Sequence, residues 1–330
     1  TFSLPAYAAF CSRLRIPSRD QGIIPFDRPF GTQMFLRREI ARGLEDGIHD
    51  FLILKGGRQI GGSTECDALT LYWLQTHPGM VGQMVSDDLA NMRFRRKLLR
   101  QMLASLPPTW RYPINADNQE FLEWGAPCHS TLVFDYAGIR AESNLGRSKG
   151  LNYLYADELG SRPDQHAVSA LDAARSEEHP ARLYLWPSTA RGFNTLKVMW
   201  DAAETSVERR RVFVAWWQHE GYQVGRETEM FRAYGQHAPT SDERIWIHLI
   251  KGRYDHPITR EQLAWWRWRL AEKFFGDEAM MCQEFACIPE QAFQAFGDKF
   301  IAPWLIQRLR LTLPGQPTPS CYRYEWGPTL

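Results

Sequence analysis

Short apolar runs and amphipathic stretches alternate along residues 31–205, at a spacing of roughly 30 residues that is typical of βα units. The first run, 51–54, predicts a buried strand, and Gly56 and Gly57 end it. Apolar residues with helical spacing follow this break, at Cys66, Leu69 and Trp73. The pattern therefore predicts a strand, a glycine-rich turn and a helix in direct succession.

Further apolar runs predict more strands at 80–86, 151–156 and 181–186. The segments 119–124 and 131–136 flank a turn rich in Gly, Pro and Ser, which predicts a hairpin. A helix is expected from Asp87 or Asp88, either of which can cap it, to about Leu103. Strands that alternate with helices in this way predict the α/β class with a doubly wound, mostly parallel sheet.

The rest of the chain has a different character. Residues 1–30 show no clear periodicity and are interpreted as an N-terminal arm, whereas 31–205 form the expected core of the domain. After about residue 205 we expect no further alternating units, so 206–300 is assigned to the remainder of the domain and a small helical lid or linker subdomain. A capping box at 259–262 predicts a helix there, and the Pro- and Gly-rich segment 301–330 is read as a linker or tail.

Composition and charge exclude several classes of protein. Charged residues make up 23% and hydrophobic residues 44% of the 330, which is ordinary for a globular domain. The net charge of +1 excludes a globally basic DNA-coating protein, but it leaves room for a local basic channel. The six scattered cysteines form no metal-ligand pattern and are interpreted as reduced core thiols. No apolar run approaches the length of a membrane span, and no signal peptide is evident, so neither a membrane nor secretion is expected.

The glycine-rich turn has the pattern of a phosphate-binding loop. Residues 56–63 match G-x-x-x-x-G-K-[ST] except at Gly62, which stands where the lysine is expected. Backbone N–H groups of such a loop cradle phosphate, and the dipole of the following helix adds partial positive charge. The candidate nucleotide-binding residues of this segment are Gly56, Gly57, Gln59, Ile60, Gly61, Gly62, Ser63 and Thr64.

Lys55, directly before the loop, is a candidate to replace the absent lysine. Strand alternation leaves open whether its side chain points into the core or toward the loop. An unpaired lysine in a core is costly, so a partner is expected, either the nucleotide or an acid such as Asp157. The alternative is that Gly62 simply disables the loop.

Polar residues follow two of the predicted strands. Asp157 and Glu158 end the strand 151–156, where an aspartate and the Ser63 hydroxyl can hold Mg²⁺ and a glutamate can activate water. Ser188 and Thr189 follow the next strand and can sense a γ-phosphate. Alternatively, the two acids are a helix cap and the Ser-Thr pair is a plain turn. Their common place at the carboxyl ends of strands favours a single ligand site.

Two further features have open interpretations. Gln33, at the start of a predicted helix, either hydrogen-bonds an adenine edge or faces solvent. The helix that follows the strand 80–86 is expected to carry a basic surface, either a solvated face or a phosphate-facing ridge for DNA. The basic residues of this surface are Arg93, Arg95, Arg96, Lys97 and Arg100.

The combination of motifs resembles the ATPase domain of the large terminase subunit of tailed phages. The resemblance rests on 56–63 with its Arg-Gln pair, on Asp157-Glu158, on 187–190, and on a linker-like segment at 283–300. It covers about 30–300. It implies a P-loop ATPase of the additional-strand, catalytic-glutamate type that uses ATP and Mg²⁺ to move double-stranded DNA into a procapsid. It also implies a homo-oligomeric ring, expected to be a pentamer, on the portal protein, a small terminase subunit as partner, and the cytoplasm of an infected bacterium as location.

The resemblance also implies roles for single residues. Gln33 would lie near the adenine, Arg58 would touch phosphate, and Ser188 with Thr189 would form the coupling motif. Arg147 matches an arginine that acts in trans on the ATP of a neighbouring subunit in some relatives; its alternative is an exposed loop charge or a DNA-phosphate contact. Some terminases carry their loop lysine displaced toward the strand, as Lys55 is.

The segment after Phe300 bears on the expected activities. Its 30 residues hold one acid, Glu325, whereas a two-metal nuclease needs several convergent carboxylates. We therefore expect no nuclease activity from this chain and interpret it as a fragment. Two alternatives stay open: a helicase-like, nucleic-acid-dependent ATPase, which would need a second motor domain, and a nucleotide-binding but hydrolysis-impaired assembly module.

Overall fold

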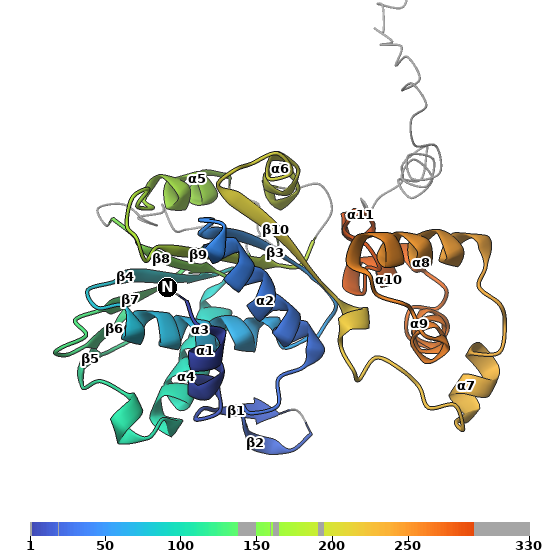
Figure 1. Ribbon diagram of the computed structural model, residues 1–330, viewed down its shortest axis with the longest axis horizontal. Coiled ribbons are helices and arrows are strands. Elements are labelled where there is room, and N and C mark those ends of the chain that lie inside the picture. Colours follow the sequence, from blue (N-terminus) through green and yellow to red (C-terminus); the bar gives the residue numbers. More distant parts are fainter. Residues whose placement is uncertain are drawn as a thin grey trace, which may run out of the picture.

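The computed structural model of the chain describes residues 2–18, 20–137, 150–158, 160, 165–190 and 195–293. Its centre is an eight-stranded sheet in the order β10-β3-β9-β8-β4-β7-β6-β5 (Figure 1). The strands are β3 (Asp50–Gly56), β4 (Val81–Ser86), β5 (Ile114–Asp117), β6 (Phe121–Trp124), β7 (Thr131–Tyr136), β8 (Tyr153–Ala156), β9 (Leu183–Ser188) and β10 (Arg209–Ala215).

The sheet is parallel from β10 to β7 and antiparallel only where β6 and β5 extend it as a hairpin edge. The loop strand β3 does not pair with β8, because β9 lies between them. A strand at this place has the position of the additional strand that the family resemblance implied. The predicted fold class, a mostly parallel P-loop type α/β fold, is thus confirmed.

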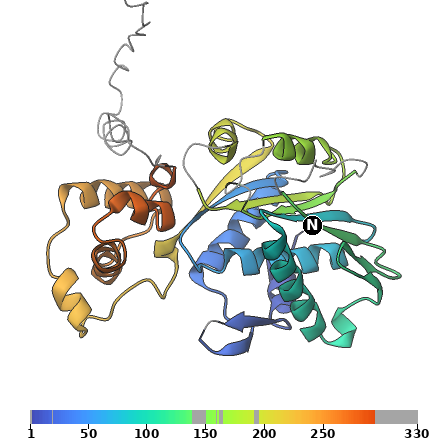
Figure 2. The same cartoon turned by 180° about the vertical axis from the view of Figure 1, so that it is seen from behind.

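Alternate residues of β3 serve two separate cores on the two faces of the sheet. Phe51 and Ile53 pack with α1 to α4, whereas Leu52 and Leu54 pack with α5 and α6. Figures 1 and 2 show these helices on opposite faces. The helices are α1 (Leu4–Cys11), α2 (Gly31–Glu45), α3 (Gly62–Thr76), α4 (Leu89–Ser105), α5 (Gln165–Ala173) and α6 (Thr195–Ala202).

A helical unit follows β10 and lies beside the β3–β10 edge of the sheet (Figure 1). It comprises α7 (Glu229–Tyr234), α8 (Ser241–Tyr254), α9 (Arg260–Lys273), α10 (Glu278–Glu284) and α11 (Pro289–Ala292). Tryptophans join it to the sheet: Trp216 packs on Trp265 with ring centroids 5.0 Å apart. The predicted capping box is confirmed, since the Thr259 hydroxyl accepts a hydrogen bond from the Gln262 N–H.

Two regions differ from the sequence-based expectation. The expectation of no alternating unit after residue 205 is wrong, because β10 pairs with β3 along its whole length. Its first three residues are arginines, which hide the apolar pattern of the strand.

The region 1–30 also contains regular elements, namely α1 and a two-stranded sheet of β1 (Arg15–Ser18) and β2 (Gly22–Pro25). The helix α1 is held by burial of Tyr7 and Phe10 rather than by a polar-apolar periodicity.

Several global expectations can be compared with the described part of the chain. Its cysteines, Cys11, Cys66, Cys128, Cys282 and Cys287, are all free and buried, as expected for reduced core thiols. Within the described ranges, no helix combines the length and apolar character that crossing a membrane requires. The same residues hold no cluster of three or more His, Cys, Asp or Glu side chains suited to a metal ion.

Candidate functional site

The glycine-rich loop joins the carboxyl end of β3 to the first turn of α3, which begins at Gly62. Gly61 has a φ of 74°, a left-handed conformation that favours glycine. A Cβ atom at Gly61 would also lie 2.7 Å from the Gln33 amide nitrogen, so any side chain there would displace Gln33. Gln59 likewise has a positive φ, of 54°. The loop thus turns tightly into the N-terminus of α3, the place where a loop of this kind binds an anion.

The start of α2 holds this loop through backbone carbonyls. The Thr32 hydroxyl donates to the Ile60 carbonyl at 2.6 Å, and the Gln33 amide donates to the Gly61 carbonyl at 3.1 Å. The Gln33 amide oxygen accepts from the Phe30 N–H at 2.9 Å. Gln33 is buried, so it does not face solvent, and in this structure both ends of its amide bond to protein. The side chain of Ile60 is buried in the core, so this residue offers the loop its backbone only.

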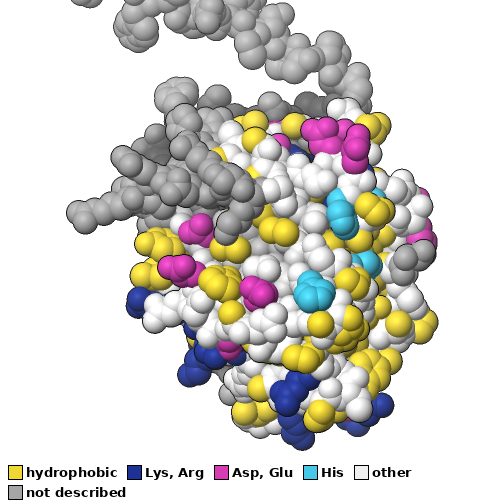
Figure 3. All heavy atoms as spheres, turned by 90° about the vertical axis from the view of Figure 1, so that its left-hand side faces the viewer, with side chains coloured by type: hydrophobic (Ala, Val, Ile, Leu, Met, Phe, Trp, Pro, Cys, Tyr) yellow, Lys and Arg dark blue, Asp and Glu magenta, His cyan; other side chains and the backbone are white. Residues whose placement is uncertain are grey.

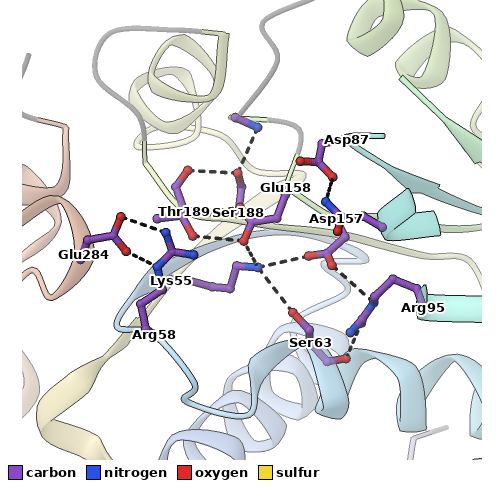
Figure 4. Close-up of polar contacts among 12 residues, drawn as sticks. Lys55, Arg58, Ser63, Asp87, Arg95, Asp157, Glu158, Ser188, Thr189 and Glu284 are labelled. Atoms are coloured by element: carbon purple, nitrogen blue, oxygen red, sulfur yellow. Dashed lines mark hydrogen bonds and ion pairs between the residues drawn. The ribbon is translucent and has the colours of Figure 1, made fainter. Parts of the chain in front are cut away.

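The side chain of Lys55 points along the loop toward the two acids that follow β8 (Figure 4). Its ammonium lies 3.1 Å from Asp157 Oδ1, 2.6 Å from Glu158 Oε1 and 3.5 Å from the Ser63 hydroxyl. The question left open by strand alternation is thereby answered: the partner of Lys55 is the pair of acids. Gly62 leaves space beside this side chain, because a Cβ there would meet only Lys55 Cδ, at 3.9 Å.

Charge pairing keeps this buried cluster ionised. Burial lowers the pKa of Lys55, but the carboxylates of Asp157 and Glu158 more than offset that effect, so its pKa lies above the usual value. Burial raises the pKa of Glu158, while the Lys55 ammonium and hydrogen bonds from Thr189 lower it, and the net direction is down. Both charged forms are therefore favoured over the neutral ones.

Glu158 is held in place by its backbone and by Thr189. Its φ of 56° is a strained value for a residue with a side chain. The Thr189 N–H donates to Glu158 Oε2 at 2.9 Å, and the Thr189 hydroxyl donates to Oε1 at 3.1 Å. Ser188 does not touch Glu158; its hydroxyl accepts from the Gly160 N–H at 3.0 Å. The end of β9 thus fixes the carboxylate that follows β8.

Arg95 is a further member of this cluster that sequence reasoning misassigned. It was expected on the basic surface of α4, but it is buried and its guanidinium donates to the Ser63 carbonyl and to Asp67, both at 2.8 Å. Its Nε lies 3.5 Å from Asp157 Oδ2. Asp157 therefore lies between two cations, Lys55 and Arg95. Burial, only partly offset by Arg95, raises the pKa of Asp67 to about 7.

Arg58, expected to touch phosphate, connects the loop to the helical unit instead. Its guanidinium pairs with both oxygens of Glu284 in α10, one of them at 2.9 Å (Figure 4). The Tyr222 hydroxyl donates to the Arg58 carbonyl. The Arg58 side chain is half-exposed, so the pair lies at the surface of the site rather than inside it.

The oxygens around the Lys55 ammonium also form a donor set that suits Mg²⁺. The Ser63 hydroxyl, Asp157 Oδ1 and Glu158 Oε1 all converge on one cation, the ammonium. Mg²⁺ prefers oxygen donors and is commonly held by one or two carboxylates together with phosphate oxygens. The chemistry of these oxygens therefore fits Mg²⁺, and the expected ligands Ser63 and Asp157 are among them.

The structure brings most of the predicted site residues together, but not all of them can be placed. Arg147 lies outside the described residues.

The sequence analysis did not single out Thr32, Arg95 or Glu284 as site residues. Thr32 could have been found, because it is next to the predicted Gln33 and has a short polar side chain that can bond to a loop. The single signal for Arg95 is its helical position: it lies three residues after Met92 and four before Leu99, both of which are buried. Nothing in the local sequence marks Glu284.

Comparisons with known proteins give similarity at the level of structure. Neither a protein-family model nor a curated protein matches the sequence. The HK97 bacteriophage large terminase is similar over 78% of this chain and 54% of its own, with 15% identity and a TM-score of 0.49. The Thermus phage P74-26 large terminase ATPase domain is similar over 76% of this chain and 98% of its own, with 13% identity and a TM-score of 0.45.

A third similar structure is the large terminase from a thermophilic bacteriophage in complex with ATP-gamma-S. The match covers 64% of this chain and 50% of that one, with 12% identity and a TM-score of 0.47. The chain thus spans about half the length of this protein and of the HK97 protein.

Proposed function

We propose that this chain is an ATPase motor of the large terminase type, which binds ATP and hydrolyses it to move double-stranded DNA into a procapsid. The observation that carries the proposal is the convergence of Lys55, Asp157, Glu158 and Thr189 beside a phosphate-type loop. These residues come from the carboxyl ends of three neighbouring parallel strands, β3, β8 and β9. This is the edge at which open α/β sheets bind ligands.

Nucleotide binding is assigned to the loop and to the cations beside it. The backbone N–H groups of the loop cradle the phosphates. Lys55 supplies the mobile positive charge that Gly62 lacks, and Arg58 contacts phosphate once it is released from Glu284. Gln33 is again proposed to lie near the adenine. Its hydrogen bond to the Gly61 carbonyl would also connect the adenine end of the site to the phosphate loop.

Hydrolysis is assigned to the two acids after β8. The bound Mg²⁺, which Ser63 and Asp157 would hold, supplies charge neutralisation on the phosphates. Glu158 orients and activates the attacking water, a role for which an ionised carboxylate is needed. Thr189 bonds to both oxygens of Glu158, so a shift of β9 would move the base. Ser188 and Thr189 are for this reason proposed as the coupling pair.

The proposal also includes assembly with other subunits. Arg147 would act on the ATP of a neighbouring subunit in a homo-oligomeric ring, expected to be pentameric. The ring would act on the portal of a procapsid together with a small terminase subunit, in the cytoplasm of an infected bacterium. No nuclease activity is expected from residues 1–330.

The test is phosphate release at varied Mg²⁺ and at high protein concentration, with and without duplex DNA. The motor proposal expects turnover that depends on Mg²⁺ and rises with DNA. Binding of ATP without turnover would instead identify a hydrolysis-impaired module, an alternative that Gly62 favours. Mixing Arg147→Ala with Glu158→Gln protein should restore part of the activity, because each lesion spares one kind of shared site.

A further inference from the structure

A basic groove runs along the outer side of α4, away from the candidate nucleotide site. It has a volume of about 800 Å³ and lies between α4, from Arg96 onward, and the segment 111–117, which contains β5. Cationic residues from both walls line it, namely Arg96, Lys97, Arg100 and Arg111. Figure 3 faces this side of the molecule and shows Lys and Arg side chains gathered on its lower part.

The groove is much more positively charged than the chain as a whole. Among the described residues that line it, Asp117 is the one acid, so four cations face a single carboxylate. Asp117 pairs with Arg96 at 3.1 Å and also with Arg100, whereas the chain as a whole has a net charge of only +1. Lys97 and Arg111 are exposed. This concentration of charge makes the groove a site for an anion.

We propose that this groove binds the phosphodiester backbone of double-stranded DNA. The proposal rests on the proposed function and names the surface through which that function would act. A groove of this volume, with cations on two walls, suits a chain of phosphates better than a single phosphate ion. Guanidinium groups are well matched to phosphate, because their planar N–H donors bind its oxygens in pairs.

The lining favours a duplex over a single strand. Proteins that bind single strands combine a basic groove with aromatic side chains on which the bases stack. Tyr112 is the one aromatic residue among the described residues that line this groove, and it is half-buried. Contacts would therefore be to the backbone and independent of sequence, with an affinity that depends strongly on salt.

The first test removes positive charge from the groove. In the double variant Lys97→Ala and Arg100→Ala, affinity for a short duplex should fall. The slope of log K against log salt should become shallower by about two, since each lost phosphate contact removes about one. The matched control is Arg232→Ala with Lys251→Ala, which removes two exposed cations from α7 and α8, also from ion pairs. The control should bind DNA as the parent chain does.

The second test removes the acid of the groove and leaves all of its cations in place. Asp117→Asn frees Arg96 and Arg100 from their shared carboxylate. DNA should then bind more tightly than to the parent chain, with a steeper salt slope. A gain of affinity cannot arise from partial unfolding, so this variant keeps the proposal testable if the double variant folds poorly.

The outcomes separate the groove from the proposed function. Phosphate release without DNA and binding of ATP should be unchanged in all these variants, because no residue of the nucleotide site is altered. If the parent chain binds duplex DNA and both groove variants keep its affinity and salt slope, the groove assignment is overturned while the motor proposal stands. If the parent chain neither hydrolyses ATP nor binds duplex DNA, the proposed function fails as well. Inorganic phosphate that competes with DNA as strongly as a duplex competitor would mark a simple phosphate site and overturn the proposal.

Discussion

Lys55 and Glu158 form a partly buried ion pair, with 2.6 Å between the ammonium and Glu158 Oε1; the side chain of Lys55 is 9% exposed and that of Glu158 23%. The proposed phosphate-binding cation is thus paired with the proposed catalytic base. Removing one partner of a fully buried pair typically costs about 3–5 kcal/mol; the exposure of Glu158 and the second bond of Lys55 to Asp157 make this an upper bound here. The bond also means that a phosphate that attracts Lys55 takes a contact away from Glu158. On the proposed roles, ATP binding and hydrolysis would be coupled through the Lys55 side chain.

Substitution of Lys55 tests whether it replaces the absent loop lysine. Lys55→Met should weaken ATP binding and reduce phosphate release to background, because the ammonium that reaches the Ser63 hydroxyl and both acids is lost. Lys55→Met should also lower the free energy of unfolding. Binding is therefore measured at a temperature well below the unfolding midpoint of the variant. Adding Gly62→Lys should restore part of the activity, since the structure leaves room beside Gly62. Unchanged kinetics in Lys55→Met, with activity gained by Gly62→Lys alone, would show that the loop is disabled as it stands.

Substitution of Glu158 tests its role as the base. Glu158→Gln keeps an oxygen that accepts from Thr189 but loses the negative charge. ATP binding should remain within a few-fold of the parent chain, whereas turnover should fall by about 10²–10⁴. Equilibrium binding of a fluorescent ATP analogue and single-turnover phosphate release measure the two effects. An equal loss of both would instead make Glu158 a structural residue.

The ionisation of Glu158 predicts how stability depends on pH. Its pKa in the folded chain lies below the ordinary 4.5. A carboxyl group with a lowered pKa contributes stability that is fully present above the ordinary pKa and is lost as pH falls through the folded value. The difference in unfolding free energy between the parent chain and Glu158→Gln should therefore stay constant from about pH 6 to pH 8 and shrink below about pH 4.5. A difference that already changes near pH 7 would contradict the paired geometry.

The Arg58–Glu284 pair predicts a competition between the helical unit and the nucleotide. Glu284→Gln should release Arg58 and lower the Kd for ATP several-fold, and Arg58→Ala should remove that gain. The matched control is Glu290→Gln, which breaks the exposed pair of Glu290 with Arg253 in the same unit. The control should leave the Kd unchanged. Equal effects of the two glutamate variants would point to loosening of the helical unit rather than to Arg58.

Arg95 is predicted to position Asp157. Arg95→Lys keeps the charge but loses the guanidinium fork, whose Nη2 donates to Asp67 and the Ser63 carbonyl while its Nε faces Asp157. The Mg²⁺ concentration for half-maximal turnover should rise several-fold, with a smaller change in the KM for ATP. Arg96→Ala, the neighbouring residue on the outer side of α4, should leave turnover without DNA unchanged. A purely structural role would lower the unfolding temperature without moving the Mg²⁺ dependence.

The sequence predicts the sheet and the loop because both have local signals. Apolar runs and glycines identify β3, β4, β8 and β9, and carboxyl ends of parallel strands meet at one edge, so Asp157 and Ser188 could be expected near the loop. The predicted partner of Lys55 follows from the cost of burying an unpaired charge. These inferences depend on chemistry within a few residues of each position.

The parts that could not be predicted depend on long-range contacts. Three arginines at the start of β10 obscure its alternation, and one of them, Arg209, pairs with Asp50 on the neighbouring strand. Arg95 looks like its basic neighbours on α4 until Asp67 and Asp157 are placed beside it. Glu284 meets Arg58 across 226 residues of chain. A single sequence holds no record of such pairs.

The helix α4 has consequences for the transmission of force. Arg95 faces Asp157, and the next residue of α4, Arg96, lines the groove. Adjacent residues of a helix are only about 1.5 Å apart along its axis and move as one body. If the groove binds DNA as proposed, a pull on the DNA phosphates would tilt this helix and alter the distance between Arg95 and Asp157, the proposed metal ligand. On this proposal, tension on the DNA would change the geometry of the proposed hydrolysis site through α4, without any change in the loop itself.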